Sequence, residues 1–254
     1  MIQTCSLDVL SSDMNQAVIL REVDTGQGPL RAFVVPPQDP GLPTVVSLHG
    51  VARDPLAHLS ALAPGALQSG FGLVVPYFEE RAWPVFQRIE RRRRPDLALI
   101  SLFDGLGVGA VRLFGFSGGA QLAHRFAMAY PNRIAALHLG AAGWYTLPDA
   151  GTAYPVGLAG AGPCAAMRAN LDHFRAIPVT VWCGSKDTER DARLRISATL
   201  DALQGPHRLA RAASYVAALK TFGMRAEFRE IPGVAHDAAD CINRGEIADH
   251  LFAV

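Results

Sequence analysis

Short apolar runs recur along the chain and alternate with longer segments in which apolar residues return every three or four positions. The runs Thr44–Leu48 and Phe71–Pro76 are rich in β-branched residues and bounded by Gly or Pro, which is typical of buried strands. Buried strands that alternate with helices predict an α/β fold with a mostly parallel central sheet and helices on both faces. We expect strands over 18–23, 30–35, 44–48, 71–76, 111–114, 134–139, 179–183 and 225–231, and helices over 58–68, 95–106, 120–130, 208–222 and 242–252.

Residues 146–170 interrupt this alternation. They are rich in Gly, Pro and Ala, which predicts a small irregular insertion over one end of the sheet, with one short helix at most. No segment of the 254 residues has the composition of a linker, so we expect a single domain over 1–254. The sequence also lacks a leader-like start and a run of about 20 apolar residues, which predicts a cytoplasmic protein with no membrane partner.

The charges nearly cancel, with 24 Lys and Arg against 23 Asp and Glu, so no global field favours nucleic acid. The one dense run, Arg91–Arg94, predicts a solvated helix start or loop, with an anionic partner as the alternative. Four cysteines, Cys5, Cys164, Cys183 and Cys241, form no CxxC pair, which favours free thiols over a zinc site or a disulfide framework. Cys183 falls in a predicted strand and is expected to be a small core residue.

Residues able to do chemistry follow several of the predicted strands. In such a sheet, sites form at the carboxyl ends of the strands. Residues 115–119 read GFSGG, residues 184–187 read GSKD and residues 232–237 read PGVAHD. A serine, an acid and a histidine therefore occur at strand ends, in that order along the chain.

Ser117 is the candidate nucleophile. The pattern Gly-x-Ser-x-Gly arises by chance in roughly 0.1 of chains of this composition, but here it lies between a predicted strand and a predicted helix, as a nucleophile turn requires. The amide of Gly118 and the helix N-terminus favour developing negative charge beside the hydroxyl. The alternative is a structural or phosphate-cradling turn, and the lack of a lysine at the helix start argues against a P-loop.

A serine hydroxyl needs a base within hydrogen-bond reach. We expect His236 in this role because it lies on a loop after the last predicted strand, and His207 is the alternative on a loop. The remaining candidates fall inside predicted helices or a strand, where structural roles suit them better: His124, His173, His250 and His138.

The base in turn needs a carboxylate to orient it. Asp187 follows a buried strand through Gly184 and is the expected acid, with Glu189 and Asp191 as nearby alternatives. Asp237 adjoins the histidine in sequence, so its side chain is expected to point elsewhere.

Two backbone amides are expected to form an oxyanion hole, those of Gly118 and Val51, with Ala52 as the alternative to Val51. Phe116, Trp144 and Tyr145 follow strands near the serine and are candidates for a substrate pocket, although they can equally pack beneath the 146–170 loop. Arg53 is expected to pair with Asp54, and otherwise to meet an acidic group of the substrate.

The segments SLHG, GFSGG, GSKD and GVAHD, in this order, resemble the α/β-hydrolase superfamily from Thr44 onward. The segments LHGVARDP, GAAGWYTLP and QGPHR are similar to poly(3-hydroxybutyrate)-depolymerase-like esterases, a branch near the feruloyl-esterase type. The resemblance implies the α/β-hydrolase fold, a triad of Ser117, Asp187 and His236, and oxyanion amides at Val51 and Gly118. It implies neither a metal nor an organic cofactor.

The expected function is therefore that of a serine carboxylic-ester hydrolase. Secreted polymer depolymerases carry a leader and often extra binding modules, so small soluble esters or short hydroxyalkanoate oligomers are the expected substrates. A thioesterase, amidase or acyltransferase with the same triad is the first alternative, and a ligand-binding protein without catalysis is the second.

Overall fold

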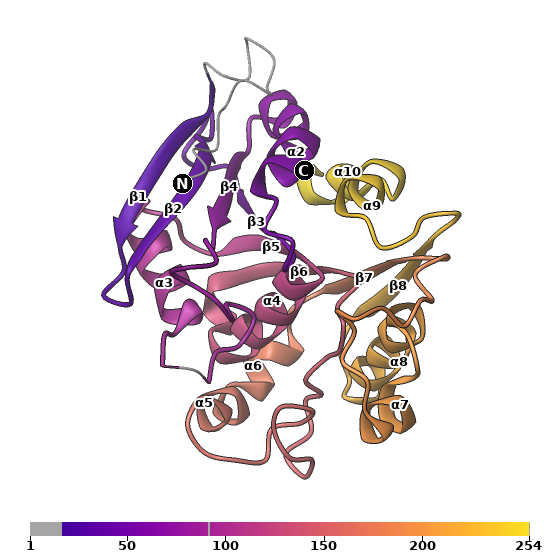
Figure 1. Ribbon diagram of the computed structural model, residues 1–254. Coiled ribbons are helices and arrows are strands. Elements are labelled where there is room, and N and C mark those ends of the chain that lie inside the picture. The colour runs from indigo at the N-terminus through magenta and orange to yellow at the C-terminus, as the bar shows by residue number, and fades with distance from the viewer. Residues whose placement is uncertain (1–16, 91, 254) are drawn as a thin grey trace.

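The computed structural model describes residues 17–90 and 92–253, and within them eight strands form one sheet. The strand order is β1-β2-β4-β3-β5-β6-β7-β8 (Figure 1). β2 pairs antiparallel with β1 and β4, whereas all pairs from β4 to β8 are parallel, which confirms the predicted mostly parallel sheet. The strands are β1 (Ile19–Asp24), β2 (Pro29–Val35), β3 (Thr44–Leu48), β4 (Gly72–Tyr77), β5 (Val111–Phe116), β6 (Ile134–Gly140), β7 (Val179–Gly184) and β8 (Ala226–Ile231).

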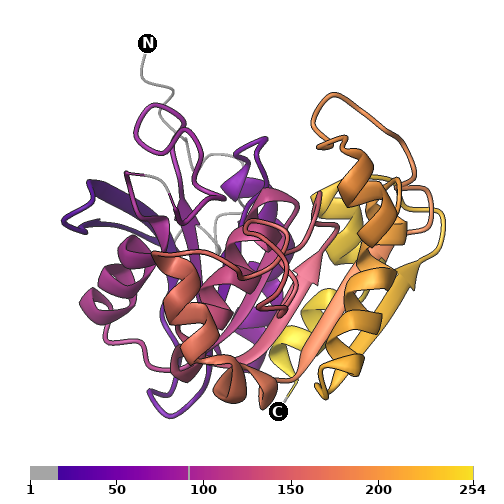
Figure 2. The same cartoon turned by 90° about the horizontal axis from the view of Figure 1, so that it is seen from below.

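Helices cover both faces of the sheet, as Figures 1 and 2 show. On one face α2 contacts α9 and α10, and on the other α4 contacts α3, α5 and α6. The central strand β3 is buried along its whole length because layers of helix cover it from both sides. The helices are α2 (Pro55–Ser69), α3 (Pro95–Gly105), α4 (Gly118–Ala129), α5 (Pro163–Ala169), α6 (Leu171–Arg175), α7 (Ala198–Gln204), α8 (Arg208–Thr221), α9 (Ala238–Arg244) and α10 (Ile247–Phe252), with a 3-10 turn at η2 (Pro131–Arg133).

Local sequence signals set the ends of α2. The Asp54 carboxylate accepts the Ala57 N–H at 2.9 Å, and Pro55 occupies the first turn, where a missing N–H costs nothing. Gly70 ends the helix with a φ of 77°, a backbone conformation that favours glycine. The Pro55–Ser69 helix thus starts three residues before the expected 58–68 segment.

The helix predicted over 242–252 is wrong, because this region forms α9 and α10 with a break at Gly245 and Glu246. A Cβ on Gly245 would lie 2.5 Å from the Cys241 carbonyl oxygen and 2.7 Å from Ile231 Cδ1, so the backbone at this break packs too closely for a larger residue. Helix α7 was not predicted, because the segment 198–204 is short and its burial depends on α8.

The 146–170 segment is irregular apart from α5, as predicted. Its fully buried Leu158 and Thr146 attach it to the rest of the structure, and Thr146 accepts a hydrogen bond from Arg125 Nε at 2.9 Å. One sheet runs through the described residues, and on this basis we propose that the chain forms a single domain.

Cys164, Cys183 and Cys241 are free, buried thiols, whereas Cys5 lies outside the described residues. In the Arg91–Arg94 run, Arg91 also lies outside them. Arg94 precedes α3 and pairs with the buried Asp96 at 2.6 Å, so this end of the run has a structural role. No helix within residues 17–90 and 92–253 has the length and apolar character needed to cross a membrane.

Candidate active site

Ser117 lies at the turn between β5 and α4 and has a strained backbone, with φ 54° and ψ −112°. Positive φ is rare for residues other than glycine and needs support from the surrounding structure. The Ser117 N–H donates to the Gly140 carbonyl at 2.7 Å, and its carbonyl accepts the Gln121 N–H at 3.1 Å. These two bonds attach the turn to β6 and to the first turn of α4.

The glycines on either side of Ser117 allow the turn to approach its neighbours. A Cβ on Gly119 would lie 2.1 Å from the Leu48 carbonyl oxygen, and one on Gly115 would lie 2.4 Å from the Gly119 carbonyl oxygen. Real Cβ atoms do not approach backbone this closely, so β3, β5 and α4 meet at this spacing only with glycine at both positions.

Gly119→Ala is therefore expected to lower the free energy of unfolding by roughly 1–3 kcal/mol, the usual cost of overpacking a core. Chemical denaturation measures this loss. Gly105→Ala is the matched control, because the new Cβ would lie 3.4 Å from the Val23 side chain, an ordinary contact. Equal effects at both positions would contradict the close-packing argument.

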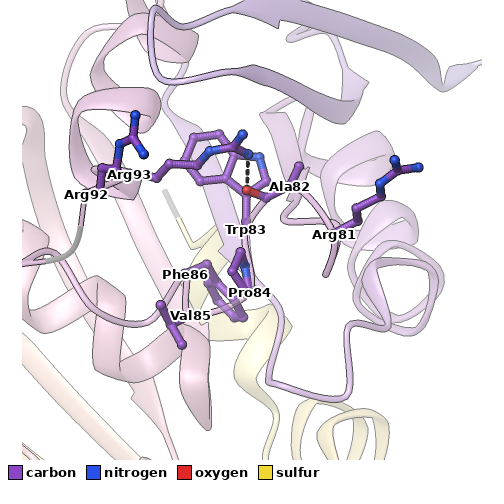
Figure 3. A pocket seen from close by; sticks show the side chains of 8 residues that line it. All are labelled: Arg81, Ala82, Trp83, Pro84, Val85, Phe86, Arg92 and Arg93. Carbon is purple, nitrogen blue, oxygen red and sulfur yellow. Dashed lines mark hydrogen bonds between the residues drawn. The ribbon is translucent and has the colours of Figure 1, made fainter.

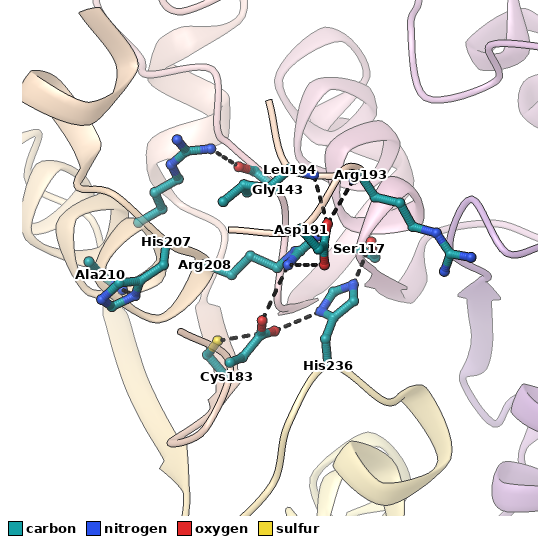
Figure 4. A network of polar contacts seen from close by, with 12 residues as sticks. Ser117, Gly143, Cys183, Asp191, Arg193, Leu194, His207, Arg208, Ala210 and His236 are labelled. Atoms are coloured by element: carbon teal, nitrogen blue, oxygen red, sulfur yellow. Dashed lines mark hydrogen bonds and ion pairs between the residues drawn. The ribbon is translucent and has the colours of Figure 1, made fainter. Parts of the chain in front are cut away.

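A continuous chain of hydrogen bonds links three of the predicted residues (Figure 4). Ser117 Oγ lies 3.1 Å from His236 Nε2, and His236 Nδ1 lies 2.6 Å from Asp187 Oδ2. The three side chains come from loops after β5, β7 and β8, so the parallel strands bring together residues up to 119 positions apart.

Asp187 is held from several directions. Its side chain is 1% exposed, and Arg208 Nη1 lies 3.4 Å from Oδ1, the oxygen that faces away from His236. Its backbone N–H donates to the Gly184 carbonyl at 3.0 Å, and its carbonyl accepts the Leu209 N–H at 3.2 Å. The positive charge of Arg208 compensates the buried carboxylate.

The imidazole of His236 packs on Phe116, with ring centroids 5.0 Å apart. The loop that carries it is tied to the loop of the acid, because the Gly233 N–H donates to Ser185 Oγ at 2.8 Å and the Lys186 N–H to the Val234 carbonyl at 2.8 Å. The histidine side chain is 20% exposed, which leaves its ring accessible from the surface.

The alternative residues have other partners. His207 Nδ1 accepts the Ala210 N–H at 3.2 Å and caps α8, and Asp237 caps α9 by accepting the Asp240 N–H at 2.8 Å. Glu189 is exposed. Asp191 forms two bonds with Arg208, at 3.0 and 3.1 Å, and so supports the site from behind Asp187.

His49 organises the loop that carries Val51. Its Nε2 accepts the Phe78 N–H at 3.0 Å, so Nδ1 carries the proton and donates to the Gly50 carbonyl at 2.8 Å. Burial lowers the pKa of His49 to about 4, which keeps the ring neutral and this pair of bonds intact near neutral pH.

The two predicted oxyanion donors are neighbours. A Cβ on Gly118 would lie 3.3 Å from the Val51 nitrogen. Gly118 is also the first residue of α4, where N–H groups have no partner within the helix.

Two cavities meet at Ser117. The first, of about 310 Å³, includes His236, Phe116, Ala52 and Asp54 in its lining. The second, of about 350 Å³, includes Gly118, Trp144 and four arginines. Val51 and Arg193 border both cavities, as Ser117 does, whereas Ala52 borders only the first.

The candidate pocket residues separate in the structure. Phe116 lines the first cavity and Trp144 the second, each 4% exposed. Tyr145 is fully buried, stacks on Tyr215 at 4.2 Å and lines neither cavity.

Arg53 bonds to the carbonyls of Phe78 and Pro84, and it has no ion pair with Asp54 in the described part of the chain. Asp54 caps α2 instead. Arg53 therefore braces the loop after β4 and does not reach either cavity at Ser117.

A third cavity, of about 440 Å³, lies beside Trp83 and Phe86 and does not include Ser117 (Figure 3). Arg81, Arg92 and Arg93 border it, and Arg93 donates to the Ala82 carbonyl. This places two further members of the Arg91–Arg94 run at the surface of a groove.

Sequence reasoning missed three features of the site: His49, Arg208 and the arginines at positions 193 and 195. The signal for the arginines is the segment ERDARLR, which follows the candidate acid and carries alternating charge. His49 directly follows a buried strand, but only the bond to Phe78 shows its role.

Comparison with solved structures identifies the architecture. Poly(aspartic acid) hydrolase-1 from Sphingomonas sp. KT-1 superposes with a TM-score of 0.77 at 21% identity, covering 93% of this chain and 98% of the other. An α/β-hydrolase fold protein from Nakamurella multipartita superposes with a TM-score of 0.56 at 18% identity, covering 92% and 99%. The chain has the α/β-hydrolase fold.

Other α/β-hydrolase fold structures are also similar. LpqC, a poly(3-hydroxybutyrate) depolymerase from Bordetella parapertussis, gives a TM-score of 0.75 at 24% identity, covering 91% of this chain and 88% of the other. No protein-family model and no curated protein matches the chain. At these identities the likeness concerns the α/β-hydrolase fold, and the chemistry has to be argued from the site.

Proposed function

We propose that this protein is a serine hydrolase that cleaves carboxylic esters through an acyl-enzyme on Ser117. The observation that carries the proposal is the unbroken contact from Ser117 through His236 to Asp187, at 3.1 and 2.6 Å. The names of its structural neighbours, which include a depolymerase and two esterases, support the same chemistry.

In the first half of the reaction, His236 Nε2 accepts the Ser117 proton as Oγ attacks the ester carbonyl carbon. The carbonyl oxygen becomes an oxyanion beside the amides of Gly118 and Val51, which act as donors without reorganising. Asp187 stabilises the imidazolium and keeps the Nδ1 proton in place. His236 then gives its proton to the departing alkoxide, which leaves as an alcohol.

In the second half, a water molecule takes the place of the alcohol. His236 removes a proton from the water as its oxygen attacks the acyl-enzyme, and then returns a proton to Ser117 Oγ. The products are a carboxylic acid and free enzyme, with no metal or redox step. Small soluble esters or short hydroxyalkanoate oligomers are the proposed substrates.

A fluorophosphonate probe tests the proposal directly, because it reacts with an activated serine. We expect covalent labelling of Ser117 in the folded protein, detected by peptide mass spectrometry, and none after heat denaturation. A panel of matched aryl esters, thioesters and amides then measures kcat/KM for each bond. No labelling, together with unchanged ligand binding by Ser117→Ala, would favour a ligand-binding protein, and a strong preference for amides or thioesters would overturn the ester assignment.

A further inference from the structure

The cavity of about 350 Å³ beside Ser117 is unusually basic. Arg88, Arg193, Arg195 and Arg208 contribute to its lining, and no Asp or Glu does. The protein as a whole has a formal net charge of only +1, so this charge is concentrated where the proposed nucleophile lies.

Two of these arginines are already neutralised. Arg208 is 2% exposed and contacts both Asp187 and Asp191, and Arg88 lies 3.6 Å from Glu90. These two side chains are therefore part of the protein's own ion pairs.

Arg193 and Arg195 differ from them. Within residues 17–90 and 92–253, neither guanidinium forms an ion pair or a hydrogen bond, and both residues are exposed. Arg195 lies over the ring of Trp144, 5.4 Å from its centroid. A planar, permanently charged group on an aromatic face keeps its N–H donors free for a planar anion such as a carboxylate.

A second positive charge lies on the same ring. The buried Arg125 guanidinium is 4.4 Å from the Trp144 centroid, and it bonds to Thr146 and to the Gln87 carbonyl rather than to a carboxylate. Its charge adds to the positive potential at this wall of the cavity.

The turn that carries Arg193 and Arg195 is held in place. Asp191 Oδ1 accepts the N–H groups of Arg193 and Leu194, at 2.8 and 3.0 Å, and the Leu194 side chain is 4% exposed. Figure 4 shows Arg193 extending from this turn away from Asp191, on the side where Ser117 and His236 lie. A preorganised turn lowers the entropic cost of binding an anion.

The position of His236 indicates which part of an ester enters this cavity. His236 lines the other cavity, of about 310 Å³, and not this one. In the mechanism above, the leaving alcohol has to reach His236, so it occupies the cavity that His236 lines. The acyl part then lies in the arginine-lined cavity.

Resting on the proposed ester hydrolysis, we propose that the preferred substrates carry a carboxylate on the acyl part, as monoesters of dicarboxylic acids do, and that Arg193 and Arg195 bind this carboxylate. Charge-assisted contacts to a carboxylate are stronger than neutral ones, and the substrate supplies the anion that the cavity lacks.

The test compares mono(4-nitrophenyl) adipate with 4-nitrophenyl 6-methylheptanoate, in which an isopropyl group replaces the carboxylate. We expect kcat/KM to be roughly 10-fold or more higher for the adipate at low salt, with the advantage shrinking in about 0.5 M NaCl. A second pair places the charge on the alcohol, 4-acetoxybenzoate against its methyl ester. Arg193 borders the alcohol cavity too, but Asp54 and Asp237 also line it, so no preference for the acid is expected. A preference for the acid in that pair, or none in the first, would overturn the inference.

Substitutions test whether Arg193 and Arg195 cause the preference for the adipate ester. Arg193→Gln and Arg195→Gln are each expected to lower the adipate-to-heptanoate ratio of kcat/KM by about 3- to 10-fold. Arg225→Gln is the matched control, because Arg225 is exposed and precedes β8, at the end of the sheet away from Ser117. It removes the same charge and should leave the ratio unchanged, so an equal fall in Arg225→Gln would overturn the assignment to Arg193 and Arg195.

The two proposals fail in different ways. Ser117-dependent turnover of the neutral ester with no preference for the adipate would overturn only the carboxylate inference. Absence of both probe labelling and turnover would overturn the proposed function and this inference with it.

Discussion

Ser117→Ala is expected to lower kcat for ester hydrolysis by roughly 10⁵- to 10⁶-fold and to abolish fluorophosphonate labelling. Alanine keeps the Cβ and removes only Oγ, the atom that lies 3.1 Å from His236 Nε2. The residual rate should come from binding and from the oxyanion amides alone. Steady-state assays with purified protein measure the loss, and circular dichroism checks that the fold is retained.

His236→Ala tests the hydrogen-bonded pair of Ser117 and His236 from the other side, again by measuring kcat. In the proposed mechanism serine and histidine act in one proton transfer, so the double variant Ser117→Ala/His236→Ala should be about as slow as either single variant. His207→Ala is the control, since His207 caps α8 and should affect stability rather than kcat. A large loss of kcat in His207→Ala with none in His236→Ala would contradict the assignment of the base.

Asp187→Asn is expected to lower kcat by roughly 10⁴-fold at neutral pH. The substitution preserves size but replaces the carboxylate oxygen 2.6 Å from His236 Nδ1 with a neutral amide. The amide no longer stabilises the imidazolium, and its NH₂ group favours the wrong tautomer of the histidine. Measuring kcat and probe labelling rates across pH separates this effect from a loss of folding.

Asp191→Asn is the control for the acid. Asp191 contacts Arg208 and has no bond to His236, so kcat should stay within about tenfold of the wild-type value while the melting temperature falls. A fall in kcat as large as that of Asp187→Asn would contradict the assignment of Asp187 alone as the acid, because Asp191, one of the acids considered from sequence, would then matter as much for catalysis.

The placement of the candidate residues at strand ends was accessible from sequence, because buried parallel strands have a simple signature. Thr44–Leu48 is β-branched and apolar at most positions, and it forms a fully buried strand with the predicted ends. Ser117 and Asp187 follow buried strands and His236 follows the half-exposed edge strand β8, so the parallel topology brings all three to one edge of the sheet. The distances between the three side chains could be obtained only from the structure.

The remaining features depend on contacts between distant segments. The break between α9 and α10 is set by Gly245 packing on Ile231, and α7 depends on its packing against α8. Tyr145 and Trp144 are adjacent in sequence, yet one is stacked in the core and the other lines a cavity. Among the described residues, Arg193 and Arg195 are left without a carboxylate partner because the nearby Asp191 binds Arg208 and backbone N–H groups instead. The sequence alone does not show this pairing.

The backbone of Ser117 has a consequence for the evolution of the protein. A non-glycine residue at φ 54° costs on the order of 1–3 kcal/mol, and glycine would adopt the same geometry without that penalty. Selection for thermal stability alone would therefore favour Ser117→Gly, which removes the proposed nucleophile. In the proposed mechanism the strained backbone is retained for its hydroxyl, so a screen that selects for stability without activity is expected to accept Ser117→Gly.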